Sequence, residues 1–149
     1  MMTPPHDPHD LQRFVDAQAA NYADAIAELR AGRKRTHWSW YVLPQIRGLG
    51  TSPMSVRYAI SGQPEARAYL DHPVLGARLR ECIAALNAHD GLTAAGILGD
   101  IDAKKLHSCL TLFAGVAGAG SPFDDALDRY FAGAPDPATV AILAGQATW

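Results

Sequence analysis

The chain has 149 residues and a mass of 15.9 kDa, a length typical of one globular domain. Hydrophobic residues make up 48% of it and charged residues 19%, which excludes an intrinsically disordered protein and supplies enough apolar surface for a core. Thirteen Lys and Arg against fifteen Asp and Glu give a net charge of -2, so no overall positive field attracts DNA or RNA, and we expect no nucleic-acid partner.

Cysteine usage and the N-terminal composition indicate the compartment. Cys82 and Cys109 lack CxxC spacing, which favours reduced thiols and a cytoplasmic location over a disulfide framework or a zinc site. Residues 1–9 are rich in proline and histidine without the apolar segment of a secretory signal, and no apolar run approaches the ~20 residues of a membrane span. We expect a flexible tail over residues 1–9, one domain over residues 10–149, no membrane association, and no metal or cofactor.

The first half of the chain begins with a strong helical pattern. Apolar residues repeat at three- and four-residue steps over residues 11–29, which predicts a long helix capped by Asp10 and ended by Gly32. Residues 36–50 are rich in aromatic and β-branched side chains and fit either a short helix or an extended stretch, with a small hairpin inside residues 38–43 as a further alternative.

The rest of the chain is punctuated by helix-start signals, mainly a capping side chain followed by proline. The further predicted helices cover residues 53–60, 64–70, 73–87, 93–98, 102–116, 122–131 and 137–143. The expected N-caps are Ser52, Asp102, Ser121 and Asp136, and Thr93 is expected to begin its short helix. Since no hairpin signal or repeat is present, we predict an all-α fold, a single compact domain of about seven helices packed as an irregular bundle.

Gln18 breaks the apolar stripe of the first predicted helix. A buried amide without partners costs ~1 to 3 kcal/mol, so this position needs hydrogen bonds. The favoured interpretation is a core amide bonded to a neighbouring backbone, and the alternative is a side chain that faces a ligand pocket.

A basic run over residues 30–35 precedes an aromatic string that starts at His37. Aromatic rings beside cations suit a planar, anionic ligand such as a nucleotide, whereas Trp38 and Tyr41, three residues apart, fit the core equally well. The candidate ligand-binding residues are Gln18, Arg33, Lys34, His37, Trp38, Trp40, Gln45, Ser52, Tyr58 and Lys105.

Catalytic signals are weak. Lys105 and Ser108 share a helix face, and a lysine of lowered pKa can activate a serine, but the usual motif places serine first, and small residues on a packed helix serve close approach. The candidates are Ser108 as a nucleophile and His37 or Glu65 as a proton carrier.

Several stretches resemble a bacterial and fungal family, the domain-of-unknown-function family 1810, many of whose members carry the automatic label calpastatin. The matching stretches are RFVDAQ over residues 13–18, ELRAGRKRTHWSWYVLPQIRGLG over 28–50, ARAYLDHPVLGARL over 66–79 and KLHSCLTLF over 105–113. The resemblance implies an α-helical fold and no established reaction. The chain departs from the family at Ser39, where methionine is typical, and at Cys109, where serine is common.

The calpastatin label conflicts with the composition. Such inhibitors are disordered as a class, whereas this chain is 19% charged and keeps helical periodicity throughout, so we do not expect calpain inhibition.

Two functional hypotheses stay open. In the first hypothesis, the chain binds an anionic, planar small molecule of nucleotide or ADP-ribose type, with or without hydrolysing it. In the second, it is a noncatalytic structural or protein-interaction module. Neither enzymatic activity nor oligomeric state follows from the sequence.

Overall fold

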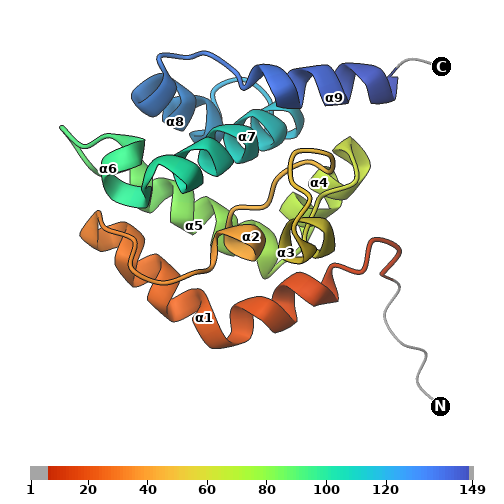
Figure 1. Cartoon of the computed structure of the whole chain (residues 1–149), viewed down its shortest axis with the longest axis horizontal. Helices are drawn as coiled ribbons and strands as arrows, with labels where there is room; N and C mark the ends of the chain where they lie inside the picture. Colours follow the sequence, from red (N-terminus) through yellow and green to blue (C-terminus); the bar gives the residue numbers. More distant parts are fainter. Residues whose placement is uncertain (1–6, 148–149) are drawn as a thin grey trace.

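In the computed structural model, residues 7–147 are described, and they form nine helices and no strand (Figure 1). The all-α prediction is confirmed, while the number of helices exceeds the expected value of about seven. One of them is the four-residue helix α2, which lies in the segment that the sequence left open between a helix and an extended stretch. The helices are α1 (Gln12–Ala31), α2 (Ser39–Val42), α3 (Pro53–Arg57), α4 (Gln63–Asp71), α5 (Leu75–Asn87), α6 (Ala94–Leu98), α7 (Asp100–Ala117), α8 (Pro122–Phe131) and α9 (Pro137–Ala147).

Helix α1 starts differently from the prediction. Asp10 has a left-handed backbone with φ of 50°, so it does not cap the helix, and that prediction was wrong. The carboxylate of Asp7 does so instead, accepting from the backbone N–H groups of Leu11 at 2.8 Å and Gln12 at 3.0 Å. At the other end, Gly32 takes a φ of 77° and terminates the helix as predicted, since glycine adopts this conformation without a steric cost.

Residues 36–50 combine the two conformations that the sequence left open. The short helix α2 is followed by an extended stretch in which Ile46 forms a parallel bridge with Ile60. The backbone N–H of Arg47 donates to the Ile60 carbonyl and that of Ile60 to the Gln45 carbonyl, both at 2.8 Å. There is no hairpin within residues 38–43, and α3 ends at Arg57 because the chain up to Ile60 is drawn into this pairing.

Most of the predicted caps are confirmed. The hydroxyls of Ser52 and Ser121 accept from backbone N–H groups three residues ahead at 3.1 and 3.3 Å, and Thr93, expected to begin its helix, caps it in the same way at 2.9 Å. Asp102, like Asp10, does not cap its helix, because α7 begins earlier, at Asp100, with Gly99 as its N-cap. The carboxylate of Asp102 is thereby left to interact with other parts of the chain.

Helix α7 is the centre of the fold. It packs against α4, α6, α8 and α9, while α1 packs on α5 and α2 (Figure 1). The side chains of Leu106, Leu110 and Phe113 along α7 are fully buried. The loop that follows α1 lies against α6 and the N-terminal part of α7, since the backbone N–H of Lys34 donates to the Ile97 carbonyl of α6 at 2.8 Å and its Nζ atom lies 2.9 Å from Asp102 of α7. None of the described helices is long and apolar enough to cross a membrane.

Candidate functional site

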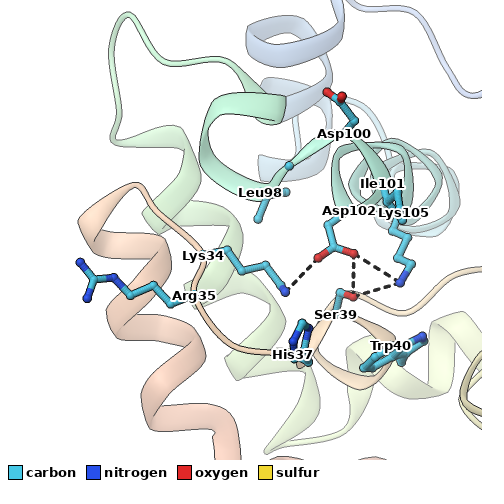
Figure 2. A pocket seen from close by; sticks show the side chains of 11 residues that line it. Lys34, Arg35, His37, Ser39, Trp40, Leu98, Asp100, Ile101, Asp102 and Lys105 are labelled. Atoms are coloured by element: carbon cyan, nitrogen blue, oxygen red, sulfur yellow. Dashed lines mark hydrogen bonds and ion pairs between the residues drawn. The ribbon is translucent and has the colours of Figure 1, made fainter.

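An open pocket of about 610 Å³ lies where the loop after α1, the short helix α2 and the N-terminus of α7 meet (Figure 2). Its walls thus come from two parts of the chain that are far apart in sequence, residues 34–40 and 98–105. The lining residues are Lys34, Arg35, His37, Ser39, Trp40, Leu98, Gly99, Asp100, Ile101, Asp102 and Lys105.

Asp102 holds together the floor of this pocket. Its Oδ2 atom lies 2.9 Å from Lys34 Nζ, and its Oδ1 atom lies 3.3 Å from Lys105 Nζ and accepts from the Ser39 hydroxyl at 3.1 Å. Figure 2 shows the two lysines reaching this carboxylate from opposite sides, with Arg35 pointing away. The side chains are largely buried, with exposed fractions of 8% for Lys34, 14% for Asp102 and 17% for Lys105.

The charges of this group do not balance. Two ammonium groups share one carboxylate, so the floor carries an excess positive charge in a position with little access to water. Each ammonium has three N–H donors, and the contacts of Lys34 and Lys105 with Asp102 and Ser39 use only part of them. Residues 99–102, at the positive end of the α7 dipole, also face the pocket.

Asp102 is held in its ionised form. Burial by itself would raise its pKa, but the hydrogen bond and charge of Lys34, the charge of Lys105 and the Ser39 hydroxyl outweigh burial, so the pKa lies below the ordinary value of an aspartate. A carboxylate with a lowered pKa is a weak proton acceptor, and its main role here is to hold the two lysines.

The aromatic residues of the segment divide between the pocket and the core. Trp40 lines the pocket, and Lys105 Nζ lies 4.6 Å from the centre of its ring, within the range of a cation–π interaction. Trp38 is fully buried instead, and its indole N–H donates to Glu28 at 3.0 Å. Of the two tryptophans, Trp40 is therefore the one that a ligand in the pocket could touch.

Glu28 fixes the loop that supplies one wall. Its carboxylate accepts from the backbone N–H groups of Arg35 at 2.6 Å and Thr36 at 2.9 Å, the Thr36 hydroxyl at 2.7 Å, and the Trp38 indole. Partial burial opposes ionisation, but these four hydrogen bonds lower the pKa of Glu28 to about 2. The loop conformation thus depends on one ionised side chain near the end of α1.

Four of the predicted ligand-binding residues meet in this pocket, namely Lys34, His37, Trp40 and Lys105. Arg33 is exposed and lies outside its lining. Gln45 and Tyr58 lie with Trp40 around a second, much smaller pocket, and Ser52 caps α3.

Gln18 is a core amide. Its Nε2 donates to the Tyr41 carbonyl at 2.7 Å and to the Tyr69 hydroxyl at 3.1 Å, and its Oε1 accepts from Arg78 at 3.3 Å. With 1% of its surface exposed and both ends of the amide bonded, it takes the first of the two roles considered for it.

Two of the three candidate catalytic residues lie apart from the pocket. The Ser108 hydroxyl is buried and bonds Thr139 at 2.8 Å, while Lys105 reaches Ser39 rather than Ser108. Glu65 is 3% exposed and accepts from Arg13 at 2.8 Å and from the Ser61 hydroxyl at 2.8 Å. His37, the third, is exposed on the pocket wall.

Sequence reasoning missed the residue at the centre of the site. Asp102 stands three positions before Lys105, a spacing that allows an ion pair on a helix, but the same pattern also fitted a helix cap. Its second cation, Lys34, and its third partner, Ser39, come from a distant segment, and no local pattern indicates that contact. No group of three or more potential metal ligands occurs among the described residues.

Comparison with known proteins places the chain in a family. The crystal structure of the conserved hypothetical protein Rv1873 from Mycobacterium tuberculosis is 51% identical in sequence, with a TM-score of 0.91 over 93% of this chain and 99% of that one. No curated protein matches. Residues 8–143 match the family described as "protein of unknown function (DUF1810)", which confirms the resemblance seen in the sequence. The chain therefore belongs to the DUF1810 family.

Proposed function

We propose that the pocket beside Asp102 binds a small anionic molecule that carries a planar group, such as a nucleotide or an ADP-ribose derivative. The observation that carries this proposal is the pair of largely buried lysines sharing one carboxylate at the pocket floor. A buried positive charge without a full counter-charge is costly, and a ligand anion removes that cost. The volume of about 610 Å³ lies in the range of small-molecule sites.

The lining residues then have separate roles. Lys34 and Lys105 bind the anionic group through charge-assisted hydrogen bonds. The ring of Trp40 and the exposed imidazole of His37 lie on the pocket wall and contact the planar group. His37 is also the candidate proton carrier if the bound ligand is hydrolysed. Chromatography of ADP-ribose that has been incubated with the protein tests whether hydrolysis occurs.

Replacement of Lys105 by methionine tests binding. K105M keeps most of the aliphatic length of the side chain but removes its charge. We therefore expect the affinity for ADP-ribose, NAD or ATP to fall about tenfold or more, because one charge-assisted hydrogen bond is lost. Calorimetry gives the affinity, and a thermal shift gives a first screen. The matched control is K104M, because Lys104 is an exposed neighbour on α7 outside the pocket. Absence of binding at millimolar ligand, or equal losses in K105M and K104M, contradicts the proposal.

A second candidate function is docking of another protein at the same rim. Ile101 lines the pocket with 73% of its surface exposed, and an exposed large apolar side chain is typical of contact surfaces. I101E separates the two functions, because it removes an apolar protein contact while leaving both lysines in place.

We further propose a cytoplasmic location, supported by two free, buried cysteines.

A further inference from the structure

The floor of the pocket distinguishes between anionic groups of different charge. This inference rests on the proposed function and concerns which phosphoryl groups the site accepts. Both carboxylate oxygens of Asp102 are engaged, Oδ2 by Lys34 and Oδ1 by Lys105 and Ser39. An anion that contacts the two ammonium groups must therefore lie beside this carboxylate as well.

Charge balance then depends on whether the phosphoryl group at the pocket floor carries one negative charge or two. One negative charge balances Lys34, Lys105 and Asp102, whereas two leave an excess negative charge beside Asp102. At the low exposure of this floor the repulsion between like charges is weakly screened.

The other charged groups around the pocket do not alter this balance. Arg35 and Asp100 have opposite charges and are exposed, as is His37, so water screens them. Figure 2 shows the Arg35 side chain directed away from the lysines. The charge count at the floor is accordingly set by Lys34, Asp102 and Lys105.

We propose that this pocket selects singly charged phosphoryl groups, as found in phosphodiesters and in pyrophosphates substituted at both ends, over terminal phosphate monoesters with two charges, and that Asp102 determines this selectivity. A terminal phosphate has a second pKa of about 6 and is doubly charged at neutral pH, while a diester carries a single charge. Asp102 thus acts by repelling the wrong ligand as much as by orienting the lysines for the right one.

Two matched pairs of adenosine ligands test the inference. The first is cyclic AMP, a phosphodiester, against AMP, and the second is ADP-ribose, a pyrophosphate substituted at both ends, against ADP. By calorimetry near pH 8, we expect the member of each pair that lacks a terminal phosphate monoester, so that each of its phosphoryl groups carries one charge, to bind about tenfold more tightly or better. In D102N the advantage falls to one or reverses, because the repulsion is removed and two ammonium groups then balance a doubly charged phosphate. The control is D24N, which neutralises an exposed acid on α1 outside the pocket and leaves the advantage unchanged.

A change of pH tests the same idea in the unaltered protein, in case D102N does not fold. As the pH falls from about 8 to about 5.5, AMP becomes singly charged, so its affinity rises towards that of cyclic AMP. Cyclic AMP keeps its charge over this range, so its affinity corrects for any change in the protein itself, including at the pocket wall where His37 lies.

The outcomes separate the two proposals. If none of the four ligands binds, the proposed function itself is wrong. If they bind and AMP and ADP, which end in a doubly charged phosphate, bind as tightly as their partners at pH 8, the selectivity is overturned while the binding function stands. A ratio that is the same in D102N and in the wild type overturns the role of Asp102.

Discussion

Glu28 shows how much of the site depends on one side chain that does not line it. Its carboxylate holds the loop that carries Lys34 and His37 into the pocket wall, through four hydrogen bonds from residues 35–38. The sequence around Glu28 offers no sign of this role, because an acid on an exposed helix face is ordinarily solvated. Only the backbone reversal after Gly32 brings the loop within reach of it.

Acid should weaken the contribution of Glu28 to stability. Its pKa is about 2 in the folded protein and near 4.5 when unfolded, so the unfolded chain binds more protons between these values. The stabilisation is present above about pH 4.5 and is lost as the pH falls towards 2. We expect urea unfolding to show E28Q less stable than the wild type at pH 7 and a smaller difference at pH 3. D24N, a change at an exposed acid of α1, serves as the control, and an equal difference for E28Q at both pH values contradicts this account.

Gln18 and Trp38 mark the limit of prediction from single residues. An amide in an apolar stripe had to find partners, and it did so as expected, but the partners Tyr41 and Tyr69 come from elsewhere in the chain. For Trp38, the sequence left both the core and a ligand site open, since its size and its polar N–H suit either. The contact with Glu28 and full burial favour the core position.

At the level of the helices, prediction succeeded where the determining interactions are local. The caps at Ser52 and Ser121 involve atoms three residues apart, so the sequence contains the whole interaction. At the start of α1 and α7 the aspartates expected as caps do not have that role. The carboxylate of Asp7 caps α1, which begins at Gln12, and α7 begins at Asp100 with Gly99 as its N-cap. The apolar periodicity therefore predicted which segments are helical, whereas the residue at which each helix begins depended on which nearby residue caps it.

The turn between α4 and α5 depends on Gly76. A Cβ atom at this position would lie 2.0 Å from the Leu70 carbonyl oxygen, which is part of the backbone and cannot rotate away. We expect G76A to reduce the free energy of unfolding by about 3 kcal/mol, at the upper end of overpacking effects, as measured by urea denaturation. G115A is the matched control, because the nearest atom to a Cβ there is 3.9 Å away and alanine stabilises a helix by about 0.5 to 1 kcal/mol relative to glycine. Equal free energies of unfolding for G76A and G115A would show that the backbone at Leu70 can shift to make room for the added methyl group.

At the level of the whole molecule, the sequence predicted the class of fold but not the convergence of the site. Lys34, Trp40 and Lys105 were each candidates, and the packing of α7 against the loop after α1 brings them together. Ser108 and Glu65 were also candidates, but they form hydrogen bonds that join helices, with Thr139 and Arg13 respectively. Which polar residues converge depends on helix packing, which a pattern of three- and four-residue steps does not specify.

Arg13 connects three parts of the molecule. Its five N–H donors meet the carbonyls of His9, Asp10, Arg57 and Ala59 and the carboxylate of Glu65, at distances from 2.6 to 3.0 Å. We expect R13M to cost about 3 kcal/mol in the free energy of unfolding, because Glu65 is left charged and buried without its partner. The double variant R13M/E65Q should recover part of that loss in the same urea experiment. No recovery would mean that the carbonyl contacts, rather than the ion pair, account for the effect.

The position of Trp40 gives the protein an optical probe at its own site. The Lys105 ammonium lies 4.6 Å from the centre of this indole, and indole emission responds to nearby charge. An anion that draws Lys105 away from the ring changes that emission. Trp38 is enclosed in the core with Lys34 Nζ 5.2 Å from its ring, so its emission is a separate contribution. Subtracting the W40F spectrum from that of the wild type isolates this signal, so ligands can be screened by fluorescence without a label.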